Sequence, residues 1–156
     1  MTTPAGPFTS ILVPYDGGEP SQAALALAFR LLGPTSRLVV VTVVNEAPLI
    51  SESAVSVAAY DPTELFEAMD EEGRVLLADA VSRCAVAKVT PVTEMVHDTP
   101  VPAILAAAKK HACDLIVMGT HGRTGIGRFF LGSTTEGVLR QSDVPVLTIR
   151  AAKALG

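Results

Sequence analysis

The sequence predicts a single-domain α/β fold in which a parallel β-sheet is covered by helices on both faces. Continuous apolar runs of strand length alternate with amphipathic segments of helix length, which is typical of a parallel sheet with right-handed crossovers. Hydrophobic residues make up 49% of the 156 residues and charged residues 18%, as expected for a sheet that is buried on both sides. A chain of this length can form one domain with a sizeable core.

The first third of the chain predicts two strands with a helix between them. Residues 11–14 form a short buried strand, and a helix follows over residues 20–32, where apolar residues recur at helical spacing. Gly33-Pro34 should end this helix. Residues 37–44 predict a central strand, because the apolar run is continuous and β-branched. Residues 46–60 show no clean period and are expected to form a mobile connection.

The alternation continues to the end of the chain. Asp61, followed by Pro62 at N1 and Glu64 at N3, should open a long helix with an apolar stripe that reaches Cys84. Residues 89–96 predict a strand, and Pro91 argues against a central place for it in the sheet. The remaining elements are a helix over residues 99–111, a strand over 115–118, a helix over 134–141 and a strand over 144–150.

Composition excludes several classes of protein. The net charge of −4 argues against general nucleic-acid binding. No apolar run approaches the roughly 18 residues of a membrane span, and residues 1–7, expected to be a flexible tail, lack the features of a signal peptide. Cys84 and Cys113 fit no metal-binding or CxxC spacing, so we expect buried thiols and a cytoplasmic location. Residues 151–156 are expected to form a short C-terminal tail.

A glycine-rich loop between the strand over residues 115–118 and the last helix is the most informative segment. Glycine lets backbone approach a ligand closely, and the N–H groups of such loops and of helix N-termini bind anions. Arg123 and Arg128 add positive charge. The simplest use of the loop is therefore to cradle phosphates.

The spacing of this loop, Gly119-x2-Gly122-x9-Gly132-Ser133, matches the nucleotide motif G-x2-G-x9-G-[S/T]. With its flanks, DLIVMGTHG and LGSTTEGVLR, and an early strand ILVPYDG that ends in Asp16, the chain resembles the ATP-binding branch of the universal stress protein family over residues 8–150. The resemblance implies a Rossmann-like three-layer sandwich with strand order 3-2-1-4-5. In that order Asp16 and Gly119 meet at the switch point of the sheet.

The resemblance also implies a function: an ATP-binding factor in stress response or regulation. Adenine would meet the backbone near Val43, ribose would meet Asp16 and Gly119, and phosphates would meet the Gly122-Arg123 turn and the start of the last helix. Mg²⁺ would be held mainly through the phosphates. The full predicted binding set is Pro14, Tyr15, Asp16, Val43, Met118, Gly119, Thr120, His121, Gly122, Arg123, Gly132, Ser133 and Thr134.

Some of these residues also have a purely structural interpretation. Asp16 is part of an Asp-Gly pair, which forms turns. Ser133 could cap the last helix in a capping box with Glu136. His121 has no second metal ligand or Ser-Asp arrangement nearby, which favours a polar loop residue beside the nucleotide over a catalytic one. Arg123 could be a solvated charge or a phosphate ligand.

Two other functions remain open. One is slow ATP hydrolysis, although the sequence offers no convincing general base, no lysine in the loop and no P-loop motif. The other is a dimeric scaffold that needs no nucleotide, against which the intact glycine motif argues. We predict no catalytic residue and no metal-ligand cluster.

Residues 144–150 form the last strand, which ends the implied strand order and so lies at a sheet edge. An apolar edge invites pairing with another chain. The family resemblance points to a two-fold homodimer through this strand, with Val146 and Ile149 near the axis. A downstream protein partner is also expected, and nothing in the sequence identifies it.

Overall fold

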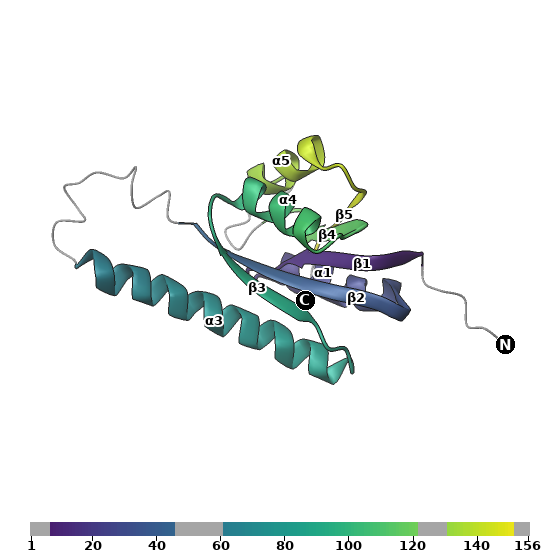
Figure 1. Cartoon of the computed structure of the whole chain (residues 1–156), viewed down its shortest axis with the longest axis horizontal. Coiled ribbons are helices and arrows are strands. Elements are labelled where there is room, and N and C mark those ends of the chain that lie inside the picture. The colour runs from purple at the N-terminus through teal and green to yellow at the C-terminus, as the bar shows by residue number, and fades with distance from the viewer. Residues whose placement is uncertain (1–6, 46–60, 122–130, 152–156) are drawn as a thin grey trace, which may run out of the picture.

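The computed structural model describes residues 7–45, 61–121 and 131–151. The expected connection over residues 46–60 lies outside these residues, as do Gly122, Arg123 and Arg128 and most of both predicted tails. Figure 1 shows a central sheet between two layers of helices.

Strands and helices alternate along the chain as expected: β1 (Phe8–Pro14), α1 (Glu19–Leu31), β2 (Leu32–Val44), α3 (Pro62–Val86), β3 (Val92–His97), α4 (Pro100–Lys110), β4 (Leu115–Gly119), α5 (Ser133–Gln141) and β5 (Val146–Ile149). The five strands pair in parallel in the order β3-β2-β1-β4-β5. The predicted fold class and strand order are therefore confirmed.

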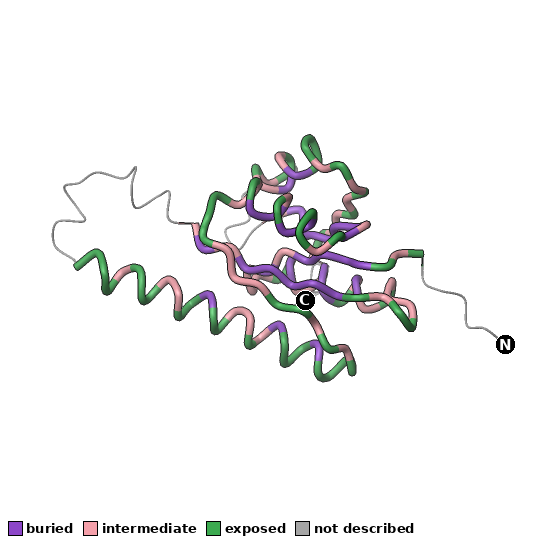
Figure 2. The backbone as a smooth tube through the Cα atoms, in the orientation of Figure 1, coloured by how far each residue is buried: buried purple, intermediate pink, exposed green. Residues whose placement is uncertain are grey.

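Two apolar clusters, one on each face of the sheet, form the core. Ile11 and Val13 pack with residues of α1 and α3, while Leu12, between them in β1, packs with residues of α4 and α5. This alternation follows from the pleat, which turns successive side chains to opposite faces. The central strands are buried on both sides, and solvent-exposed residues gather on the outer sides of the helices (Figure 2).

The start of β2 differs from the prediction. The helix α1 ends at Leu31, and β2 begins directly at Leu32 instead of at Arg37. Leu32 pairs with Phe8, and the register then shifts before the regular ladder begins. The Ser36 hydroxyl supports this irregular segment, because it donates to the Phe8 carbonyl at 2.5 Å and accepts the Gly33 N–H at 2.9 Å.

The outer elements are shorter or more exposed than expected. The strand β3 is at an edge, as Pro91 indicated, but it begins only at Val92, because a proline cannot donate to the ladder. In α3 the predicted stripe is only partly buried: Phe66 and Val81 are 41% and 42% exposed. The helix lies along β2 and β3, and its first turns extend past the sheet (Figure 1).

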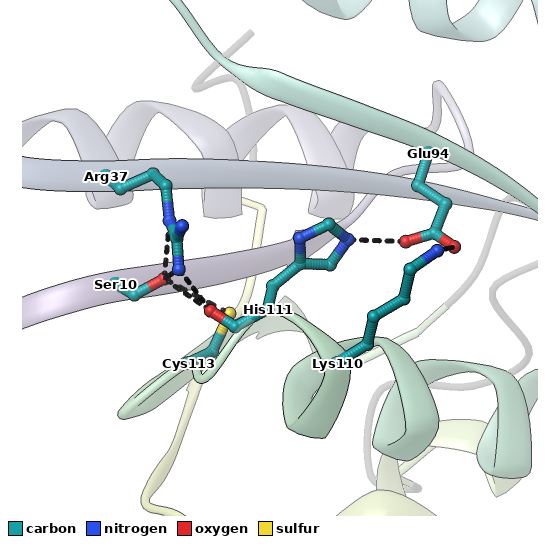
Figure 3. A network of polar contacts seen from close by, with 6 residues as sticks. All are labelled: Ser10, Arg37, Glu94, Lys110, His111 and Cys113. Atoms are coloured by element: carbon teal, nitrogen blue, oxygen red, sulfur yellow. Dashed lines mark hydrogen bonds and ion pairs between the residues drawn. The ribbon is translucent and has the colours of Figure 1, made fainter.

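A polar network holds the end of α4 against the sheet (Figure 3). Lys110 Nζ and His111 Nε2 contact the two carboxylate oxygens of Glu94 in β3 at 2.6 and 2.5 Å. Arg37 donates to the Ser10 hydroxyl at 3.3 Å and also to the carbonyl of His111. The contact with Lys110 holds the pKa of Glu94 below its ordinary value. These contacts connect α4 with β1, β2 and β3.

Candidate functional site

A cavity of about 700 Å³ opens at the carboxyl ends of β2, β1 and β4. Pockets that hold small ligands range from roughly 300 to 1,000 Å³. Because the sheet order places these three strand ends side by side, Asp16 and Gly119 line the same cavity although they are far apart in the sequence. This is the switch point of the sheet.

At the end of β1 the chain turns sharply into α1. The Tyr15 N–H donates to the Val41 carbonyl at 2.8 Å, which holds the strand end in place. Asp16 Oδ1 then accepts the Gly18 N–H at 2.9 Å, and Gly17 has a φ of +77°, which favours glycine. The structural interpretation of Asp16 as a turn former is therefore correct. Asp16 also lines the cavity, so the turn leaves its binding role open.

Tyr15 connects the cavity to α3. Its hydroxyl donates to Asp79 Oδ2, and Arg83 Nε donates to the same oxygen at 2.9 Å. Burial, followed by the hydrogen bond to Asp79, raises the pKa of Tyr15 from 10.0 to about 12. Hydrogen bonds from Arg83 and then Tyr15 hold the pKa of Asp79 below its ordinary value. Tyr15 is thus protonated at neutral pH and fixes α3 to the end of β1.

The N-terminus of α5 lies against the end of β4. The Gly132 N–H donates to the Thr120 carbonyl at 2.8 Å, and the Thr135 hydroxyl donates to the Gly119 carbonyl at 2.9 Å. The N–H groups in the first turn of a helix have no partner within the helix. The helix dipole adds partial positive charge there. This end of the cavity therefore offers hydrogen-bond donors to an anion.

The predicted capping box of Ser133 and Glu136 is wrong. Gly132 is the N-cap residue, so Ser133 occupies the first position of α5 rather than the cap. The helix begins one residue earlier than the box requires, and Glu136 pairs instead with Arg140 at 2.7 Å. The Ser133 hydroxyl therefore does not cap α5, and its contact with a ligand stays a prediction.

The glycines at this end are needed for space rather than for a left-handed backbone. A Cβ on Gly119 would lie 2.4 Å from Cβ of Pro20, so this glycine allows α1 to begin directly against β4. Gly132 has a φ of −63°, which any residue adopts, but a Cβ there would lie 3.2 Å from the Thr120 carbonyl oxygen. At Gly132 it is therefore the space beside the Thr120 carbonyl, and not the backbone conformation, that favours glycine.

His121 follows β4 and lines the cavity. Its Nδ1 lies 3.0 Å from the Thr120 hydroxyl oxygen. Its Nε2 is buried and has no hydrogen-bond partner among the described residues.

One wall of the cavity was missed by sequence reasoning. The helix α3 contributes Met69, Glu72, Gly73 and Leu76, beside the end of β2. Gly73 is the residue from which this wall could have been predicted, because a glycine inside a helix often marks close packing. A Cβ on it would lie 2.5 Å from the sulfur of Met95 in β3.

The structure brings most of the predicted binding residues together around the cavity. Those that line it are Pro14, Tyr15, Asp16, Val43, Met118, Gly119, His121, Gly132, Ser133 and Thr134. Thr120 is buried and does not line the cavity, and Gly122 and Arg123 lie outside the described residues. Within residues 7–45, 61–121 and 131–151, no three His, Cys, Asp or Glu side chains are grouped so that they could hold a metal ion.

Two further features concern the chain as a whole. Cys84 and Cys113 are buried free thiols, as predicted, and burial raises the pKa of Cys84 to about 11. None of the described helices combines the length and the apolar character that crossing a membrane requires.

Known proteins resemble the chain over nearly its whole length. The profile of the universal stress protein family matches residues 7–150. Universal stress protein MJ0531 of Methanocaldococcus jannaschii is 32% identical over 148 residues, which cover 94% of this chain and 84% of that protein. A universal stress protein of Thermus aquaticus is also 32% identical, over 92% of this chain and 99% of its own length.

Solved structures of universal stress proteins have the same fold as this chain. The structure of MJ0577 from Methanocaldococcus jannaschii superposes on this chain with a TM-score of 0.77 at 25% sequence identity. The superposition covers 91% of this chain and 95% of the MJ0577 chain. UspA from Lactobacillus plantarum superposes with a TM-score of 0.75 at 27% identity, over 91% of this chain and 97% of its own. The chain belongs to the universal stress protein family.

Proposed function

We propose that the chain binds an adenine nucleotide, ATP with Mg²⁺, in the cavity at the carboxyl ends of β2, β1 and β4. Through this binding it acts as a nucleotide-dependent factor in stress response or regulation. The observation that carries the proposal is the pairing of an apolar wall at one end of the cavity with a helix N-terminus at the other.

The two ends of the cavity suit the two ends of a nucleotide. Val43 and Met69 offer apolar surface where β2 meets α3, which fits the flat face of a base. Ser133 and Thr134 begin α5 at the other end, where backbone N–H groups and the helix dipole favour phosphate. Asp16 follows the end of β1, between these two ends, where a carboxylate can accept hydrogen bonds from ribose hydroxyls.

Two proteins of the same fold support an adenine nucleotide as the ligand. One universal stress protein structure is a complex with cAMP, at 23% identity and a TM-score of 0.64. Another, from Arabidopsis thaliana, has AMP bound, at 15% identity and a TM-score of 0.65. At these identities the likeness shows the fold alone, so the choice of ATP, like the roles of Gly122 and Arg123, rests on the resemblance of the glycine motif.

The carboxylates that line the cavity limit how Mg²⁺ can bind. Mg²⁺ prefers oxygen ligands and commonly takes one or two carboxylates together with substrate phosphates. Asp16 and Glu72 are the acidic residues that line the described part of the cavity. They fit an ion that arrives with the nucleotide and is held mainly through its phosphates.

Calorimetric titration with ATP tests the proposal. We expect Gly132→Val to weaken binding by at least about tenfold, because the branched side chain would occupy the space beside the Thr120 carbonyl. Leu139→Ala is the matched control, since Leu139 lies on the same helix, is 42% exposed and does not line the described cavity. Failure of the wild type to bind any adenine nucleotide would refute the proposal. Slow turnover of bound ATP would instead favour the hydrolytic alternative.

Asp16 can be tested by a pair of substitutions that separates its two roles. Asp16→Asn keeps an oxygen that can accept the Gly18 N–H, so the turn survives, but it removes the charge. Asp16→Ala removes both. We expect Ala to weaken ATP binding by about 1–3 kcal/mol and Asn to weaken it mainly when Mg²⁺ is present. Equal affinity of the wild type and both variants would leave Asp16 as a turn residue alone.

We further propose that the chain forms a homodimer through residues 144–150. The strand β5 is at the edge of the sheet, and Leu147 is 38% exposed. The Pro145 carbonyl accepts the N–H of Ile116 in β4, and the Ile149 carbonyl accepts the N–H of Thr120, which directly follows β4. The odd-numbered residues of β5 therefore face β4. In a parallel ladder the backbone groups of Val146 and Thr148 then point to the open edge.

This geometry selects the variant that tests the dimer. Thr148→Pro removes an N–H from the open edge and keeps the bonds to β4, whereas proline at Leu147 would break the bonds within the chain. We expect light scattering to show a dimeric wild type and a monomeric, folded Thr148→Pro. A monomeric wild type would contradict this assembly. A cytoplasmic location and a downstream protein partner remain predictions from the sequence.

A further inference from the structure

The turn that carries Asp16 is contacted by α3 on both sides. Tyr15 precedes Asp16, and its hydroxyl donates to Asp79 Oδ2 on α3. Gly17 follows Asp16 with a φ of +77°, and a Cβ placed on it would lie 2.7 Å from Cδ2 of Leu76, also on α3. The helix therefore meets the residue before and the residue after the carboxylate that lines the cavity.

Both contacts come from a part of α3 that is packed closely against the sheet. Leu76 and Asp79 are three residues apart, so they are neighbours on the helix surface. Gly73, one turn earlier, is buried, and a Cβ there would lie 2.5 Å from the sulfur of Met95 in β3. Ala80, directly after Asp79, is buried as well. This part of α3 has a defined place, and it can hold the turn in one as well.

The Tyr15 hydroxyl sets where α3 lies relative to the end of β1. Its backbone is fixed to β2, because its N–H donates to the Val41 carbonyl at 2.8 Å and its carbonyl accepts the Thr42 hydroxyl at 2.9 Å. With the tyrosine anchored in this way, the hydrogen bond to Asp79 places the helix. Leu76 then fills the space beside Gly17, which has no side chain of its own.

Asp79 acts from outside the cavity. Its side chain is 41% exposed and does not line the described cavity. Arg83 Nε donates at 2.9 Å to the same carboxylate oxygen that accepts the Tyr15 hydroxyl, which directs the carboxylate toward Tyr15. An ion pair on the surface of α3 is thus connected to the Asp16 turn through one aromatic side chain.

We propose that Asp79 and Leu76 are positioning residues for nucleotide binding, which hold the turn of residues 15–17 so that the Asp16 carboxylate meets the ribose hydroxyls. The inference rests on the proposed function. It adds to that function a helix outside the glycine motif whose docking sets the affinity for the sugar.

Titration with ATP and with dideoxy-ATP, which lacks both ribose hydroxyls, separates positioning from a general effect on the fold. We expect Asp79→Ala to weaken ATP binding by about fivefold, the effect of one lost hydrogen bond, and to change dideoxy-ATP binding by less than about twofold. Asp79→Asn keeps an oxygen that can accept the Tyr15 hydroxyl, so it should retain most of the ATP affinity. Glu71→Ala is the matched control, because Glu71 pairs with Arg74 on the same helix and does not line the described cavity.

Two further variants test the path from α3 to the turn. We expect Tyr15→Phe to weaken ATP binding about as much as Asp79→Ala, and the double variant to be no weaker than either, because both remove the same hydrogen bond. Leu76→Ala should also weaken ATP binding more than dideoxy-ATP binding, since it opens space beside Gly17.

Three results would overturn the assignment. Wild-type affinity of Asp79→Ala for ATP would remove α3 from the positioning of the turn. An equal loss for ATP and dideoxy-ATP would mean that the substitution acts through the fold and not through Asp16. Additive losses in Tyr15→Phe and Asp79→Ala would separate the two residues. Failure of the wild type to bind ATP would instead refute the proposed function itself.

Discussion

Alkaline pH should weaken the fold through Tyr15, whose hydroxyl holds α3 to the end of β1. Burial and Asp79 raise its pKa from 10.0 to about 12, which corresponds to about 3 kcal/mol of stability. The unfolded chain loses the tyrosine proton first. The stabilisation is therefore complete below pH 10 and disappears as the pH rises to about 12.

Denaturant unfolding at pH 9 and pH 11, for the wild type and Tyr15→Phe, measures this contribution. At pH 11 we expect the wild type to have lost about 1 kcal/mol more than the variant, because about half of the pKa difference has then taken effect. Absorbance titration of tyrosinate gives the pKa itself, and Tyr60→Phe removes the signal of the other tyrosine. A Tyr15 that titrates near 10, or equal alkaline losses in both proteins, would refute the reasoning.

Thiol reactivity, helix packing and acid stability provide three more tests. Because burial raises the pKa of Cys84 to about 11, we expect it to react with an aromatic disulfide at pH 8 only as fast as the chain unfolds; immediate reaction would contradict its burial. Gly137→Ala should destabilise by about 1–3 kcal/mol in urea unfolding, since the new Cβ would lie 2.6 Å from a methyl of the stiff Val101, and an increase in stability would be inconsistent with this packing. Burial opposes the ionisation of Asp114, but hydrogen bonds from residues 9 and 10 outweigh it and lower its pKa, so its contribution is present above about pH 4 and lost below. We expect Asp114→Asn to be less stable by about 1–2 kcal/mol at pH 7 and to lose less stability in acid, and an unchanged acid response would count against this assignment.

Much of the fold could be predicted because its central strands are buried on both faces. Such strands appear in sequence as continuous apolar runs, and helices between them imply parallel pairing. The order of the strands came from the family resemblance, since periodicity does not specify which strands are neighbours. Element ends were less accurate: β2 begins at Leu32, where a hydroxyl from Ser36 supports an irregular pairing that no local pattern signals.

The candidate site was predictable where it depends on strand ends and glycines, and less so where it depends on tertiary packing. Asp16 and Gly119 follow directly from the motif and the topology. The wall formed by α3 does not, because the helix reaches the cavity only by packing along β2 and β3. The helix cap was wrong by one residue, since Gly132 and Ser133 both suit the start of a helix and the contact of Gly132 with Thr120 decides between them.

The most direct test of nucleotide binding in this cavity is a titration of nitrogen-15-labelled protein with ATP, followed by amide correlation spectra. We predict that the largest shifts will fall on Val43, Gly119, Ser133 and Thr134, at the carboxyl ends of β2 and β4 and the start of α5. The amides of Ser10 and Glu94, in the polar network that holds α4, should move little. No saturable shifts, or shifts gathered at that network, would contradict the account.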